Sequence, residues 1–78
     1  MEKSKYLDVA LKTLSQVFSD GGAKATIDVM AKLKLKDVTD IDAKTISACN
    51  SVLHERVRML KGDEIATKFY SMLNNACR

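Results

Sequence analysis

The sequence predicts an all-α protein, a compact bundle of four short helices with the third helix central. Apolar residues recur three and four positions apart in four successive segments, and residues at this spacing share one face of a helix. Short polar or glycine-containing stretches separate these segments, and the chain contains no proline. A chain of 78 residues is long enough for one domain, residues 1–78, with a thin core.

The first helix is expected from about Ser4 to Ser19. Its apolar stripe comprises Leu7, Ala10, Leu11, Leu14, Val17 and Phe18. The Ser4 hydroxyl can accept hydrogen bonds from the free backbone N–H groups at the helix start. Residues 20–22 contain two glycines, and glycine readily adopts the left-handed conformation that closes a helix. We therefore expect the helix to end there.

The second helix is expected from about Ala23 to Leu33. Its narrow stripe of Ile27, Met30 and Ala31 indicates packing on one neighbour. Residues 32–36 alternate between lysine and leucine, which is the period of a strand. Because no second strand candidate lies nearby, we interpret them as a fraying helix end in which Leu33 and Leu35 hold the turn on the core.

Residues 37–42 supply three carboxylates and a hydroxyl, which predicts a helix start. The third helix is expected from about Asp42 to Lys61, with the stripe Ile46, Cys49, Leu53, Val57 and Leu60. Gly62 ends this helix, and Asp63 is expected to cap the next one. The fourth helix runs from about Glu64 to the end of the chain, with the stripe Ile65, Phe69, Met72 and Ala76. A turn this short predicts a tight corner between the last two helices.

The chain is mildly basic, and the charge is unevenly placed. Thirteen basic residues against ten acidic ones give a net charge of +3. All of this excess lies in residues 1–36, most densely at Lys32, Lys34 and Lys36. The cluster suits the C-terminal turn of a helix, where cations are favoured. It could also attract nucleic acid or an acidic partner.

The cysteine content and the hydropathy predict a cytoplasmic location. Two cysteines are fewer than a small secreted domain normally carries, which indicates free thiols in a reducing compartment. No apolar segment resembles the core of a signal peptide or reaches the roughly 18–20 residues that a membrane span needs. We therefore expect a protein that is neither secreted nor inserted into a membrane.

The residue pattern predicts no catalytic, metal or cofactor site. Cys49 and His54 lie five residues apart, which turns them about 140° from one another on a helix. Together with Cys77 they therefore make neither a zinc site nor an activated nucleophile. Residues 37–42 lack the glycine and distal glutamate of a calcium loop, and residues 21–22 lack the rest of a phosphate-binding loop. We expect no enzyme, no cofactor and no small-molecule substrate.

A protein-binding surface is the favoured functional prediction. The third helix has a second apolar edge, and the fourth helix adds apolar residues outside its stripe, so both apolar sectors are wide. Methionine and tyrosine are well suited to interfaces. Burial of the third helix on two sides would explain the same pattern. We expect one surface for another protein, or for a second copy in a homodimer, formed by Val52, Met59, Tyr70 and Leu73.

A DNA-binding regulator is the alternative. The second and third helices could form a helix-turn-helix, in which the residues facing DNA would be Lys44, Ser47, Ser51 and Arg58. Three features weaken this alternative: the connection is longer than the usual 3–4-residue turn, it is acidic, and Glu55 lies among the residues that would face DNA.

The favoured functional prediction is therefore a small cytoplasmic accessory or regulatory protein that docks on another protein. Phage and mobile elements encode proteins of this kind.

Overall fold

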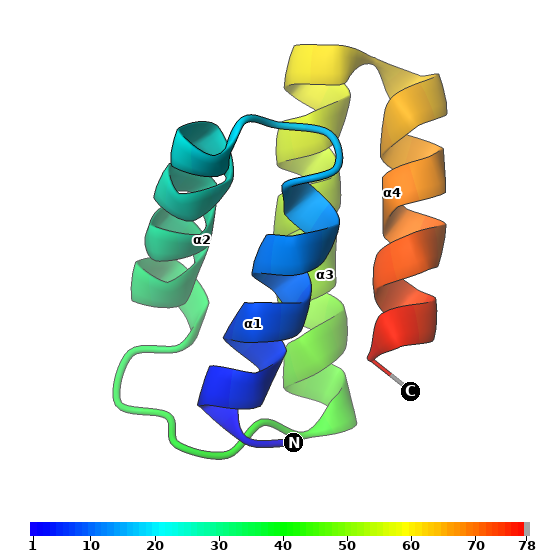
Figure 1. Ribbon diagram of the computed structural model, residues 1–78. Coiled ribbons are helices and arrows are strands. Elements are labelled where there is room, and N and C mark those ends of the chain that lie inside the picture. The colour runs from blue at the N-terminus through cyan, green and yellow to red at the C-terminus, as the bar shows by residue number, and fades with distance from the viewer. Residues whose placement is uncertain (78) are drawn as a thin grey trace.

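The computed structural model describes residues 1–77 and is shown in Figure 1. These residues form four helices: α1 (Lys3–Leu14), α2 (Asp20–Lys34), α3 (Ala43–Lys61) and α4 (Asp63–Ala76). The helices alternate in direction, so that α1 and α3 run up the view in Figure 1 while α2 and α4 run down. The prediction of an all-α bundle of four short helices is confirmed.

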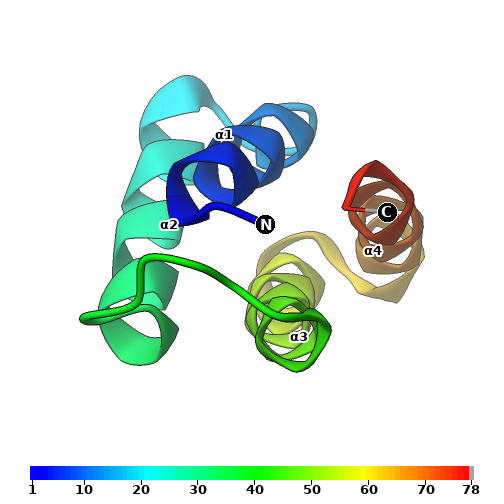
Figure 2. The same cartoon turned by 90° about the horizontal axis from the view of Figure 1, so that it is seen from below.

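Each helix packs on two neighbours around a single core. In the end-on view of Figure 2, α1 lies between α2 and α4, and α3 lies across from it between the same two helices. The α3–α4 contact is the most extensive, and α3 is the longest helix, which agrees with its predicted central role. The buried apolar residues are Tyr6, Ala10, Leu14, Ala23, Ile27, Met30, Leu35, Ile41, Cys49, Leu53, Val57, Ala66, Phe69 and Leu73.

The boundary between α1 and α2 differs from the prediction. α1 ends at Leu14, and Gly21 and Gly22 lie in the first turn of α2. The reason is Ser19, whose hydroxyl oxygen accepts a hydrogen bond from the Gly22 backbone N–H at 3.3 Å. A serine cap followed by Asp20 in the first turn stabilises a helix start at this point. The glycines therefore begin a helix instead of ending one.

The other helix ends are partly as predicted. The Asp42 carboxylate caps α3 by accepting a hydrogen bond from the Thr45 backbone N–H at 2.8 Å, and this bond holds the pKa of Asp42 below its usual value. Gly62 joins α3 to α4 in the left-handed region, with φ of 93°, which confirms the tight connection. Ser4 and Asp63 do not act as caps, because each already belongs to its helix.

α4 is rotated relative to its predicted stripe. Its buried residues are Ala66, Phe69 and Leu73, whereas Ile65 is 40% exposed and Met72 is 37% exposed. The small side chain of Ala66 allows α4 to lie close to α3 immediately after the glycine connection. Once this contact is made, Leu73 faces the core, and Ile65 and Met72 remain exposed.

Two leucines that were predicted in the core are exposed. Leu60 on α3 is 60% exposed, and Leu33 at the end of α2 is 69% exposed. Leu35 is fully buried, as predicted. The backbone N–H of Leu35 donates to the Ala31 carbonyl at 2.8 Å, which closes the last turn of α2 and directs the Leu35 side chain into the core.

The connection between α2 and α3, residues 35–42, is held at both of its ends. Leu35 and Ile41 are both buried in the core. The Ile41 backbone N–H donates to the Met1 carbonyl at 2.8 Å, and the Lys3 N–H donates to the Thr39 carbonyl at 3.2 Å. The start of α3 is thereby fixed against the start of α1.

A chain of polar side chains crosses the core and begins at Tyr6, which belongs to none of the predicted apolar stripes. The Tyr6 hydroxyl donates to Asn50 Oδ1 at 2.6 Å, and Asn50 Nδ2 donates to Asn74 Oδ1 at 2.9 Å. The two bonds link α1, α3 and α4. Burial raises the pKa of Tyr6 well above its usual value, because the phenolate would lose its solvation.

Leu53→Ala is expected to lower the free energy of unfolding by about 2–5 kcal/mol, because it leaves a cavity where a fully buried side chain stood. Urea denaturation followed by far-UV circular dichroism measures this loss. Leu60→Ala, at an exposed position on the same helix, is the matched control and is expected to change stability by less than about 1 kcal/mol. Equal losses in the two variants would contradict the observed orientation of α3.

Tyr6→Phe is expected to cost about 1–3 kcal/mol at neutral pH, because Asn50 Oδ1 loses its buried donor. The pKa of Tyr6 is raised in the folded state above its unfolded value of about 10. The stabilisation by neutral Tyr6 is therefore complete below about pH 10 and is lost as the pH rises further. Urea titrations at pH 7 and above pH 10 should show the advantage of the wild type over Tyr6→Phe shrinking. A constant advantage would contradict the assignment.

Candidate functional site

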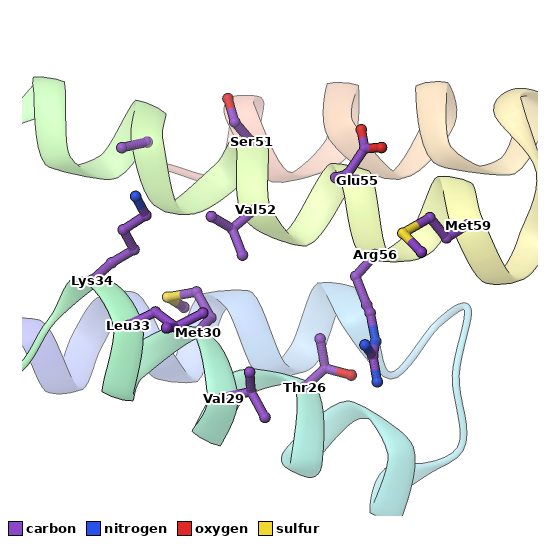
Figure 3. Close-up of a pocket in the computed structure, with 11 residues that line it drawn as sticks. Thr26, Val29, Met30, Leu33, Lys34, Ser51, Val52, Glu55, Arg56 and Met59 are labelled. Atoms are coloured by element: carbon purple, nitrogen blue, oxygen red, sulfur yellow. The ribbon is translucent and has the colours of Figure 1, made fainter.

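A groove runs between α2 and α3 (Figure 3). Its volume is about 650 Å³, which is within the range of ligand-binding pockets. The α2 side is formed by Thr26, Val29, Met30, Leu33 and Lys34, and the α3 side by Ala48, Ser51, Val52, Glu55, Arg56 and Met59.

The surface of the groove is mainly apolar and open to water. Val29 is 52% exposed, Leu33 is 69% exposed and Met59 is 70% exposed, while Met30 beneath them is fully buried. Single exposed apolar residues are normal at a protein surface. Here three large ones gather around one hollow.

The groove is open because the two connections of α3 differ in length. Gly62 alone joins α3 to α4, and these helices pack closely. Residues 35–42 join α2 to α3, and the contact between these two helices is less extensive. Figure 2 shows α2 along one side of the bundle and inclined to α3, which is seen nearly end-on. The side chains that would close the gap thus remain at the surface.

Some polar groups of the groove are already hydrogen-bonded within the protein, whereas two of its charged groups form no ion pair among residues 1–77. The Thr26 hydroxyl donates to the Gly22 carbonyl of its own helix at 2.9 Å. Glu55 accepts hydrogen bonds from Arg58, which lowers the pKa of Glu55 and raises that of Arg58. Among residues 1–77, no ion pair involves Lys34 or Arg56. The charges left available in the groove are therefore positive.

The four residues predicted for protein docking do not form one surface. Val52 and Met59 both line the groove. Tyr70 is half-buried on α4, where its ring centroid lies 4.7 Å from that of His54 on α3. Leu73 is fully buried, because the rotation of α4 turns it into the core. The prediction that these residues make a single contact surface is wrong. Because Leu73 is buried, Leu73→Asp is expected to unfold the chain.

Val29 and Leu33 line the groove but were not predicted from the sequence as part of a binding surface. Val29 lies outside the predicted stripe of the second helix, and Leu33 was placed on the core. They are four residues apart, so they share one face of α2. This spacing was the available signal, because it indicates a second apolar edge on α2 like the one that Val52 and Met59 make on α3.

The residues predicted to face DNA lie on the exposed side of α3. Lys44, Ser47 and Ser51 are exposed. Arg58 is also exposed but is bonded to Glu55, and its Nη1 lies 3.9 Å from Asp63 Oδ1. α2 and α3 run in opposite directions and are joined by residues 35–42, whereas a turn of only about 3–4 residues joins the helices of a helix-turn-helix. The arrangement thus gives no support to this alternative.

Other kinds of site find little basis in the described part of the chain. Within residues 1–77, no three side chains of His, Cys, Asp or Glu are grouped so that they could hold a metal ion. Cys49 and Cys77 are free, and burial raises the pKa of both thiols, which disfavours the reactive thiolate. None of the helices in this part of the chain combines the length and the apolar character required to cross a bilayer.

No protein-family model, curated protein sequence or solved structure matches this chain. The groove between α2 and α3 combines exposed apolar side chains with two basic groups, Lys34 and Arg56, that form no ion pair within residues 1–77.

Proposed function

We propose that this chain is a small cytoplasmic accessory or regulatory protein that acts without catalysis, by docking another protein in the groove between α2 and α3. The exposure of Val29, Leu33 and Met59 around one hollow is the observation that supports the proposal. A monomer that left this surface permanently in water would gain nothing from it, whereas a bound partner would cover it.

The expected energies fit a docking surface. Removing a large apolar side chain fully from water is worth about 1.5–3 kcal/mol. The three side chains are between one-half and three-quarters exposed, so each would contribute roughly 1–2 kcal/mol when a partner covers it. A few apolar anchors of this kind usually carry most of the binding free energy of an interface.

Leu33→Asp and Met59→Asp are expected to abolish partner binding while the helical circular dichroism spectrum is retained. Both side chains are mostly exposed, so a charge costs little in the free protein, but it would be desolvated in the complex. The measurement is affinity capture from an extract of the source cells, with each variant as bait, in the presence and absence of nuclease. Met72→Asp, at an apolar position of α4 that is 37% exposed and lies outside the groove, is the control.

A protein retained by the wild type and by Met72→Asp, lost with both groove variants and insensitive to nuclease, is the expected result. Direct titration of that protein against the same variants then measures the change in affinity. Retention of the same proteins by all four baits would contradict docking in the groove. Capture that disappears on nuclease treatment would favour the DNA-binding alternative.

A further inference from the structure

We infer that the segment occupying the groove is an amphipathic helix of about three turns that carries acidic side chains on either side of its apolar stripe. This inference rests on the proposed docking function and specifies the chemistry of the partner. Three properties of the groove carry it: its helical walls, its length and the charges that flank it.

The walls of the groove favour a helix over an extended strand. Both walls are helices, α2 and α3, whose backbone N–H and C=O groups are already paired along most of their length. An extended segment would find no backbone partners there and would bury its own polar groups unpaired, which is costly. A helix satisfies its backbone internally and presents only side chains, as in other complexes in which a helix lies in an apolar groove.

The length of the groove sets the length of that helix. On α3 the lining residues extend from Ala48 to Met59. At a rise of 1.5 Å per residue, this span is roughly 16 Å, or about three helical turns. A helix of this length presents apolar side chains at positions i, i+3 or i+4, and i+7 along one face. These three anchors equal in number the large exposed apolar residues of the two walls, which are Val29, Leu33 and Met59.

The charges of the groove specify acidic flanks. Lys34 lies toward one end of the groove and Arg56 toward the other, with Leu33 and Val52 between them (Figure 3). Neither basic group has an ion-pair partner among residues 1–77, whereas the acidic lining residue Glu55 is already bonded to Arg58. Opposite charges across an interface fix the register and accelerate association. A ligand with acids at both flanks would therefore satisfy the two free cations.

A second copy of this chain is a poorer occupant of the groove. In a symmetric dimer the same surface meets itself. Each copy would bring Lys34 and Arg56 but a single acidic lining residue, Glu55, which is already engaged with Arg58. Such a contact would place an excess of positive charge on both sides of one interface, and this repulsion disfavours the homodimer.

The first test uses synthetic peptides and the intact chain. The acidic peptide has about fourteen residues on an alanine background, with leucines at helical spacing and glutamates beside them. One control peptide has lysine in place of every glutamate, and another has the same composition in scrambled order. Circular dichroism checks that the helicity of the acidic and lysine peptides is comparable. We expect fluorescence anisotropy to show affinity for the acidic peptide, on the order of tenfold weaker affinity for the lysine peptide, and none for the scrambled one.

The second test reverses the two charges of the protein. Lys34→Glu/Arg56→Glu is expected to weaken binding of the acidic peptide by on the order of tenfold and to strengthen binding of the lysine peptide, since two exposed attractions become repulsions. The matched control is Lys24→Glu/Lys68→Glu, which makes the same change in net charge at exposed lysines outside the groove. It is expected to leave the preference for the acidic peptide unchanged. Added salt should reduce that preference.

The outcomes that overturn the inference differ from those that overturn docking itself. If both charged peptides bind equally, and Met59→Asp removes both, the groove takes helices but the acidic flanks are wrong. If neither peptide binds while a cellular partner still requires Met59, the occupant is not a helix of this kind. If the chain sediments as a dimer that Met59→Asp dissociates, the occupant is a second copy. Partner capture that is unaffected by Leu33→Asp and Met59→Asp removes the docking function and this inference together.

Discussion

The close packing of α3 on α4 is the constraint on which the rest of the structure depends. A single glycine with a positive φ of 93° joins the two helices, so they must lie against one another from the first turn of α4. This contact sets the rotation of α4, and it places Phe69 and Leu73 in the core. α1 then packs on the far side of that core, and α2 is left to meet α3 along a longer connection. The groove is a consequence of this asymmetry between the two links of α3.

Much of the fold could be predicted from the sequence because local signals determine it. Four stripes at helical spacing gave four helices, and Gly62 and Asp42 marked the ends correctly. The failures occurred where two signals competed. At residues 19–22, a serine cap was stronger than the tendency of paired glycines to end a helix. On α4, two overlapping stripes shared Phe69, and only the packing against α3 selects between them.

The candidate site was predictable only in part. Val52 and Met59 stood out because they lie beside a well-defined stripe on the longest helix, and both line the groove. On the other wall, the four-residue spacing of Val29 and Leu33 indicated a shared helix face. Whether that face lines a groove depends on how far α2 inclines from α3, which this spacing does not determine. The same limit applies to Tyr6, whose buried position depends on Asn50 and Asn74, residues distant from it in the chain.

The polar chain through Tyr6, Asn50 and Asn74 ties α1, α3 and α4 together, but among the described residues no side-chain hydrogen bond joins α2 to another helix. α2 is held by apolar contacts, which tolerate sliding better than hydrogen bonds with fixed geometry do. Local opening in proteins concentrates in elements that have few specific tethers. The backbone amides of α2 should therefore exchange with solvent faster than those of the other three helices. We therefore expect this wall of the groove to be adjustable, so that under the proposed function one surface would accept ligand helices of different girth.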